Sequence, residues 1–202
     1  MHRPVLVKPP EILPVTLDEM KQALRIVERD ASGAVLPHED DDLIEDEIQS
    51  AVSHYEGWTG ILGIALCEQG WRQDFDRFDS MLCLPIGPAL HISAVRWRNK
   101  AGQMATVNEA DYARVTDAAG QSSVRFGNSF VFPTDLYEGA AVQVDYRAGW
   151  PIIDGHSTVP ADLKAAIKMR VQAAYDEASR DASLNLQRIE KALVSKWRRS
   201  VL

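Results

Sequence analysis

Seven carboxylates fall within nine positions of the chain, from Glu39 to Glu47, in the stretch PHEDDDLIEDEIQSA. Carboxylate oxygens bind hard divalent cations and act as general acids and bases. The stretch lacks the glycine of a calcium-binding loop, and no histidine stands at metal-ligand spacing within the helix that it predicts. We therefore favour an acidic helix face that meets water or a partner, with a metal-dependent hydrolase site at Glu39–Glu47 as the alternative.

The apolar residues of this region predict a helix over 41–56 that ends at Gly57. They recur at steps of three and four positions, so they share one helix face: Leu43, Ile44, Ile48, Ala51, Val52 and Tyr55. The acidic residues at 40–42 then lie at the helix N-terminus, where N–H groups and the helix dipole favour negative charge. Glu45, Asp46 and Glu47 are expected to point away from the apolar face.

No other stretch carries a catalytic or cofactor motif. The chain has no GxSxG elbow and no Gly-Lys-Ser/Thr phosphate loop, and its five histidines are scattered without HExxH or zinc spacing. Cys67 and Cys83 form no CxxC pair, and we expect both thiols to be buried and reduced. We predict a structural scaffold rather than an enzyme, with no catalytic residues, no metal and no cofactor.

The charge of the chain is unevenly distributed. Its 202 residues carry a net charge of −7, yet residues 184–202 hold five basic residues and one acidic residue, so this tail is +4 and the rest is −11. General nucleic-acid binders are more often basic, and no apolar run reaches the ~20 residues of a membrane span. We expect a soluble protein that is not secreted and whose basic tail seeks another surface.

The middle of the chain, 65–150, is rich in short alternating runs typical of strands. Its candidate elements are strands at 91–97 and 141–147, a turn at 99–102, and a hairpin over 123–132 about Gly127-Asn128. We predict about five antiparallel strands in a small unit.

Helical patterns occur on both sides of this unit. Thr16 and Glu19 form a capping box that begins a first helix after an extended arm. Another helix starts at Pro160, and RDAS at 180–183 is a predicted break after it. Its apolar face holds Leu163, Ile167, Val171, Ala174 and Ala178, and that of the last segment holds Leu186, Ile189, Leu193 and Trp197.

These elements predict an α+β fold, a bundle of about four helices with an inserted small antiparallel β-unit. The expected divisions are an extended arm and two helices at 1–64, the β-unit at 65–150, a third core helix at 151–183 and a basic docking helix at 184–202. The last helix either packs on the body or docks on a partner, since Trp and Arg often dominate binding energy at interfaces. Membrane-surface and nucleic-acid binding are weaker alternatives.

Four stretches together resemble the phage head–tail connector (adaptor) family. They are VKPPEILPVTLDEMKQALRI, DDDLIEDEIQSAVSHYEGWTG, LCLPIGPALHISAVRWRNKAG, and VQVDYRAGW followed by VPADLKAAIKM. The resemblance covers about 5–175 and is greatest to the long members with a β-insertion, found in prophages and gene transfer agents. It implies a ring, commonly of twelve subunits, that lies under the portal protein, extends the DNA channel and joins capsid to tail.

The resemblance also implies partners and a place. The partners are the portal protein, a head-completion, stopper or neck protein, and further copies of the chain, while double-stranded DNA passes through without specific binding. The place is the neck of a virion or phage-like particle, assembled in the bacterial cytoplasm, with no membrane partner. The family's C-terminal segment contacts the portal, which here corresponds to Leu193, Trp197, Arg198, Arg199, Val201 and Leu202.

An acidic wall would let DNA slide, because it makes none of the cation contacts that hold DNA. Glu45, Asp46 and Glu47 are therefore candidates for the channel lumen or for a contact with the next subunit. In the second case their basic partners would be Arg96, Arg98 and Lys100. Another neck or tail component, such as a stopper or terminator, is the alternative within the same particle, and a DNA-binding regulator is a further one.

Overall fold

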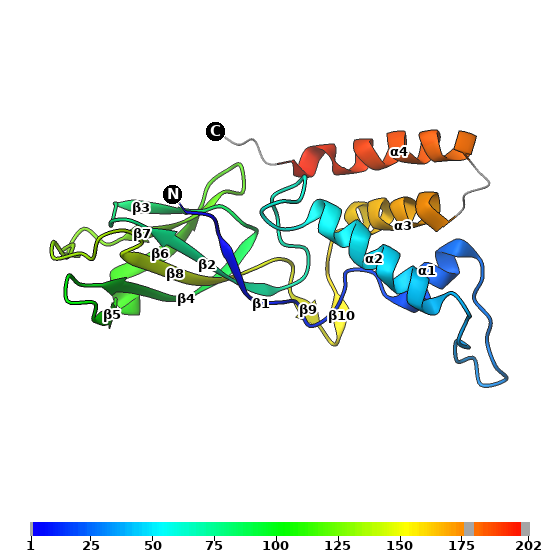
Figure 1. The fold of residues 1–202 in the computed structure, drawn as a ribbon, viewed down its shortest axis with the longest axis horizontal. Coiled ribbons are helices and arrows are strands. Elements are labelled where there is room, and N and C mark those ends of the chain that lie inside the picture. The colour runs from blue at the N-terminus through cyan, green and yellow to red at the C-terminus, as the bar shows by residue number, and fades with distance from the viewer. Residues whose placement is uncertain (1, 176–179, 199–202) are drawn as a thin grey trace. The chain divides into compact units, whose positions relative to one another are not determined.

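The structure is a computed structural model that describes residues 2–175 and 180–198, with 180–184 described by their backbone alone. The chain divides into two compact units, and it passes between them three times. The β-unit comprises Met1–Glu11 and Gly63–Pro151, and the helical unit comprises Ile12–Leu62 and Ile152–Leu202. Figure 1 shows both units, and the sheet content of the β-unit is larger than the small insertion that the sequence predicted.

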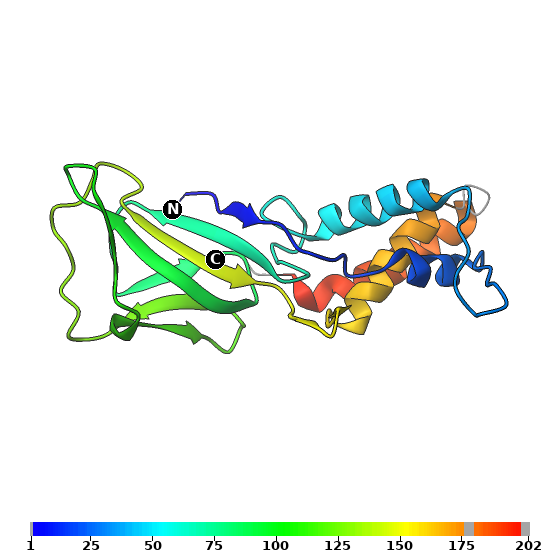
Figure 2. The same ribbon diagram turned by 90° about the horizontal axis from the view of Figure 1, so that it is seen from below.

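The β-unit contains two antiparallel sheets. The five-stranded sheet has the order β1-β2-β8-β4-β5, formed by Val5–Lys8, Gln69–Phe75, Val142–Ala148, Ala89–Arg98 and Met104–Thr106. The three-stranded sheet has the order β3-β7-β6, formed by Met81–Leu84, Ser122–Phe126 and Tyr112–Thr116. A short 3-10 helix η1, Glu109–Asp111, precedes β6. Buried residues of both sheets belong to one hydrophobic core. Figure 2 shows the strands of the β-unit from a second side.

The alternation predicted at 141–147 is confirmed in β8, where Val142, Val144 and Tyr146 are buried and Arg147 is exposed. The hairpin predicted about Gly127-Asn128 is wrong. The turn that joins β6 to β7 lies instead at 117–121, where the Asp117 carboxylate accepts N–H groups from Ala119 and Gln121. Gly127 follows β7 and donates its N–H to Asp111.

The two cysteines of the β-unit differ in exposure. Cys67 is buried, as predicted, but Cys83 on β3 is exposed. Strand β3 has alternating burial, and Cys83 lies between the buried Leu82 and Leu84, so the pleat directs its side chain to the other face. The Cys83 thiol lies 3.6 Å from the hydroxyl of Ser123 on the paired strand β7.

The helical unit is built from α1 (Leu17–Leu24), α2 (Asp41–Tyr55), α3 (Ala161–Tyr175) and α4 (Arg180–Val194). The short strands β9 (Ile152–Ile153) and β10 (His156–Ser157) form a hairpin before α3, and a 3-10 turn η3, Ser195–Trp197, follows α4. Helix α3 contacts each of the other three helices. Within the described residues, no helix is long and apolar enough to cross a membrane.

Local sequence explains the first helix well. Thr16 caps α1 by accepting the Glu19 N–H at 3.2 Å, as predicted, and Val15 and Met20 are fully buried.

The break predicted at 180–183 is wrong, because these residues lie within α4. Of the apolar face predicted for α2, Leu43 is the exception, since it is 51% exposed while the other five residues are buried.

Candidate interaction surfaces

The acidic stretch divides into a structural half and an exposed half. Asp41 begins α2, and its carboxylate accepts the His38 N–H at 3.0 Å and Lys21 Nζ at 3.2 Å. Lys21 is only 2% exposed and also donates to the Leu36 carbonyl at 2.6 Å. The His38 N–H and then the Lys21 ammonium hold the pKa of Asp41 below its usual value. Asp41 therefore joins α1 and the loop after it to the start of α2.

Asp40 is used in a similar way, because its carboxylate accepts a hydrogen bond from the Tyr175 hydroxyl of α3 at 2.6 Å. This hydrogen bond, followed by burial, raises the pKa of Tyr175. Among the described residues, no three His, Cys, Asp or Glu side chains come together in a way that would hold a metal ion. The stretch Glu39–Glu47 thus works locally as a helix start that is tied to α1 and α3.

The exposed half lies on the outer side of α2. Asp42, Leu43, Glu45 and Asp46 are exposed, and we call these four residues the acidic face. Asp46 lies one turn from Leu43, whereas Glu45 lies on the opposite flank of the helix and also borders a hollow described below. None of the three carboxylates has a hydrogen bond or ion pair to another described residue. Glu47, which the sequence grouped with Glu45 and Asp46, is half-buried. This face is available to a partner.

Helix α4 is attached to the body through a buried carboxylate. Glu190 is 6% exposed and accepts hydrogen bonds from the Tyr55 hydroxyl of α2 and, at 3.4 Å, from Arg170 of α3. Burial, followed by the hydrogen bond to Glu190, raises the pKa of Tyr55. Val194, one turn further along α4, is 1% exposed. The face of α4 that packs inward is therefore defined by Glu190 and Val194.

This arrangement changes the predicted apolar stripe. Ile189 is 47% exposed, and Leu186, Leu193 and Trp197 are half-buried. The burial of Glu190 could not be predicted from the sequence, because a glutamate is rarely buried unless other elements supply its partners. The outer side of α4 consequently exposes Arg188, Ile189, Lys191 and Ala192, and we call these four residues the basic face.

The end of the described chain is held by Asp162, near the start of α3. Its Oδ2 accepts the Trp197 indole N–H at 3.1 Å and lies 2.6 Å from Lys196 Nζ. Burial acts to raise the pKa of Asp162, but the hydrogen bonds from Lys196 and Trp197 together hold it below its usual value. Of the residues predicted to bind the portal, Arg198 is exposed. Arg199, Val201 and Leu202 lie outside the described residues.

The basic residues of β4 are already engaged within the β-unit. Arg96 lies 2.9 Å from Asp145 of β8, and Arg72 of β2 donates to the same carboxylate at 2.8 Å. The Arg98 guanidinium lies 5.2 Å from the centre of the Tyr137 ring, in cation–π geometry. Arg96 and Arg98 are thus weaker candidates for pairing with another subunit than their sequence positions suggested, while Lys100 is exposed.

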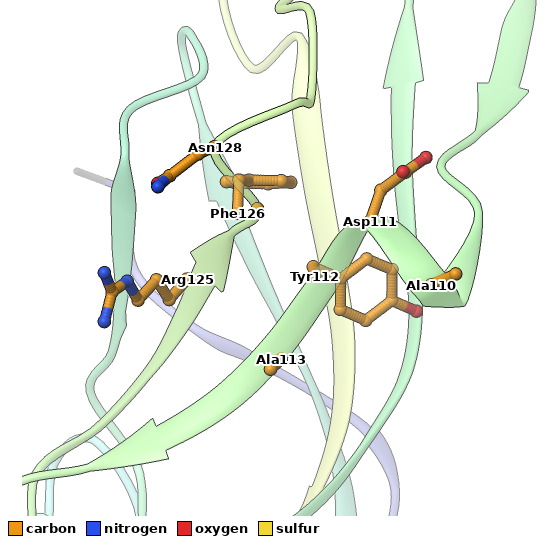
Figure 3. Close-up of a pocket in the computed structure, with 8 residues that line it drawn as sticks. Ala110, Asp111, Tyr112, Ala113, Arg125, Phe126 and Asn128 are labelled. Carbon is orange, nitrogen blue, oxygen red and sulfur yellow. The ribbon is translucent and has the colours of Figure 1, made fainter.

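Two hollows were not predicted by the sequence. One, of about 350 Å³, lies where β6 begins and β7 ends. Figure 3 shows two of its lining residues, Tyr112 on β6 and Arg125 on β7. Burial, followed by the charge of Glu109, raises the pKa of Tyr112. Its lining has one cation and no nucleophile beside a base, so it offers no catalytic geometry.

The second hollow, of about 490 Å³, lies within the helical unit. It is lined by residues 12–17, by Glu45 and Ile48 of α2, by the β9–β10 hairpin and by Lys164 of α3. Its walls are mainly apolar, and its two acidic groups, Glu19 and Glu45, are accompanied by Lys164. Because both acidic and basic side chains border this hollow, its lining favours neither an anionic nor a cationic ligand.

The chain is similar over its full length to proteins of known structure. No protein-family model and no curated protein matches its sequence. A chain of the virion of a native gene transfer agent particle matches with a TM-score of 0.73 at 22% identity, over 98% of this chain and 96% of that chain. A chain from the neck of an empty gene transfer agent particle, computed with C6 symmetry, matches with a TM-score of 0.76 at 22% identity, over 100% of this chain and 97% of that one.

A third match, at 22% identity and a TM-score of 0.66, is a chain from the neck of a native gene transfer agent particle computed with C12 symmetry, over 98% of this chain and 97% of that one. The similarity includes both units, because each alignment covers at least 98% of this chain and at least 96% of the matched chain. The chain thus has the complete fold of proteins found in the neck of gene transfer agent particles.

Proposed function

We propose that this protein is a structural component of the neck of a gene transfer agent or related phage-like particle, and specifically its head–tail connector (adaptor). In this role it forms a ring under the portal protein, extends the DNA channel and joins capsid to tail. The observation that carries the proposal is the match of the entire chain, both units together, to neck chains of such particles. The symmetry of one of those necks, C12, supports a ring of twelve copies.

The charge of the chain suits a channel wall. The net charge outside residues 184–202 is −11, so the ring surface has little general attraction for the DNA that passes through it. The proposed partners are the portal protein, the next neck or stopper protein and further copies of the chain. None of them requires a catalytic residue or a cofactor.

The portal contact is proposed for the C-terminal end: Leu193, Trp197, Arg198, Arg199, Val201 and Leu202. The structure refines how this contact would be made. Trp197 is bonded to Asp162 within the chain, so its indole N–H reaches a partner only if this bond is released. Arg198 is exposed and can bind without any rearrangement. We therefore expect Arg198 and the residues after it to make the first contact.

The test is co-purification with the portal protein from the same genome, with mass photometry to report how many copies bind. A chain that ends at Trp197 keeps the buried Glu190 and Val194 in place, so it separates loss of binding from loss of folding. A Trp197→Ala variant tests the indole itself. Trp58→Ala is its matched control, because Trp58 is 45% exposed in the same unit and far from the C-terminal end in sequence.

We expect the full-length chain and Trp58→Ala to bind the portal protein as a ring, and the shortened chain to bind at least tenfold more weakly. If the shortened chain binds equally well, residues 198–202 do not make the contact. If Trp197→Ala also binds equally well, the contact lies on the body and the assignment of the C-terminal residues is wrong. If the full-length chain does not bind the portal protein at any salt concentration, the adaptor role is wrong.

A further inference from the structure

The helical unit exposes two helix faces of opposite charge. The acidic face of α2 carries Asp42, Glu45 and Asp46 with Leu43 on one flank, and the basic face of α4 carries Arg188 and Lys191 with Ile189 on one flank. The two apolar side chains are exposed to nearly the same extent, 51% for Leu43 and 47% for Ile189. Each face spans five positions, which is about 6 Å of helix at ~1.5 Å per residue. The faces are thus matched in length and opposite in charge, with three carboxylates on one and two cations on the other, and each carries one exposed large apolar side chain.

The charges on both faces are unused within the chain. Asp42, Glu45 and Asp46 have no ion pair to another described residue, and the same holds for Arg188 and Lys191. Other cations near the two faces are engaged, since Arg170 is bonded to Glu190 and Lys196 to Asp162. A partner that neutralises these faces would therefore break no ion pair among the described residues.

The two faces also lie on separate helices that both pack on α3. The buried side of α2 comprises Ile44, Ile48, Ala51, Val52 and Tyr55, and the buried side of α4 includes Glu190 and Val194. The charged faces are on the sides of these helices that do not take part in that packing. Two different complementary patches on one chain produce a head-to-tail contact, which closes into a ring when the rotation between copies permits it.

We infer that the acidic face of one copy binds the basic face of the next copy, with Leu43 against Ile189 on one flank of the contact and the opposite charges facing one another beside them. The inference rests on the proposed ring and names the surfaces that form it. Complementary charge across an interface fixes register and orientation, and the two exposed apolar side chains add contact area. The inference replaces Arg96 and Arg98 as partners of the acidic helix, because Asp145 and Tyr137 engage them within the chain.

Charge exchange tests this pairing. We expect Arg188→Glu/Lys191→Glu to weaken ring formation on the portal protein at least tenfold, and Glu45→Lys/Asp46→Lys to have a similar effect. An equimolar mixture of the two variants should restore the ring, because alternating copies place an acidic face against a basic face at every contact. One chain with all four substitutions should also recover assembly to within about threefold. Arg77→Glu/Arg114→Glu is the control, because it makes the same charge change on exposed arginines of the β-unit.

Cross-linking then tests the geometry. In a Cys83→Ser background, which removes the exposed thiol, Leu43→Cys and Ile189→Cys chains are prepared separately and oxidised alone or mixed. We expect a disulfide-linked dimer in the mixture and little in either chain alone. Dimers of Leu43→Cys with itself, or of Ile189→Cys with itself, would show that like faces meet and would overturn the inference.

The outcome also separates this inference from the proposed function. If the chains bind the portal protein as a ring but neither the charge exchange nor the cross-link has an effect, the adaptor role stands and the two faces are not its subunit contact. If the chains do not bind the portal protein and the mixed cysteine variants at high protein concentration give no cross-link, both proposals fail. A cross-link without portal binding would keep the pairing and remove the adaptor role.

Discussion

Glu190 of α4 accepts a hydrogen bond from the hydroxyl of Tyr55, which ends α2 and lies 135 positions earlier in the chain. Both side chains are buried, and Arg170 of α3 contacts the same carboxylate. Three helices that are separate in sequence are thus held at one buried polar contact. Such contacts are stabilising only while every member keeps its partner, and this gives direct tests.

Replacing Tyr55 with phenylalanine should lower the free energy of unfolding by ~1–3 kcal/mol, because Glu190 then remains buried with one donor fewer. Urea denaturation followed by circular dichroism measures the change. Tyr137→Phe is the control, since Tyr137 is 41% exposed, and it should change stability by less than ~0.5 kcal/mol. Equal effects of the two substitutions would show that the hydrogen bond contributes nothing.

The same contact predicts a response to alkaline pH. Burial and Glu190 raise the pKa of Tyr55 in the folded state above its usual value of 10.0, so the unfolded chain loses this proton first. The stability that this hydroxyl provides is complete below pH 10 and is lost as the pH rises above it, by up to ~1.4 kcal/mol per pH unit. The free energy of unfolding, measured at pH values between 9 and about 11, should therefore fall more steeply with pH for the natural chain than for Tyr55→Phe. Parallel curves would contradict this.

Asp162→Asn should loosen the end of the chain. The substitution removes the charge that pairs with Lys196, while the amide oxygen can still accept the Trp197 indole N–H. We expect a loss of ~0.5–1.5 kcal/mol and faster cleavage after Lys196 by trypsin. Because the pKa of Asp162 is lowered in the folded state, the difference from the natural chain should be present above pH 3.8 and shrink at more acidic pH. A difference that does not change with pH would point to packing alone.

Lys21→Ala should be among the most damaging single substitutions of the helical unit. It removes a 2% exposed ammonium and leaves the Leu36 carbonyl and the Asp41 carboxylate without this donor. We expect a loss of about 3 kcal/mol, measured by urea denaturation. Lys168→Ala is the control, since Lys168 is more exposed and lies 3.5 Å from Glu19 in a looser pair. Lys21→Ala with the stability of the control would show that the buried pair is not stabilising.

Millimolar calcium or magnesium should change the melting temperature by less than about 1 °C, because Asp40 and Asp41 are bonded to Tyr175 and Lys21 rather than grouped about a cation. Differential scanning fluorimetry measures this. A rise of several degrees that is lost in Asp41→Ala/Asp42→Ala would instead favour the metal-dependent hydrolase.

The sequence predicted elements whose pattern is local. The Thr16 cap, the alternation of β8 and the buried side of α2 all depend on neighbours within a few positions. The predictions from the sequence failed where residues far apart in the chain determine the local structure. The turn at 117–121 was missed because Gly127-Asn128 has equally good turn residues, and only the pairing of β7 with both β3 and β6 selects between them.

The outer side of α4 was missed for a similar reason. An apolar stripe through Ile189 is the simplest pattern in the sequence, yet Glu190 is buried because Tyr55 and Arg170 supply its partners. Neither partner can be identified from the sequence around Glu190. The same limit applies to Arg96, whose pairing with Asp145 depends on the register of β4 against β8.

The chain passes between its two units three times, at 11–12, 62–63 and 151–152. A pull on one unit is therefore shared by three covalent backbone segments rather than borne by a single linker. One proteolytic cut in any of these segments leaves two intact tethers between the units. For a protein proposed to join capsid to tail, this threading gives the joint mechanical redundancy for as long as the packing within each unit, such as the pairing of β1 with β2, holds its chain segments together.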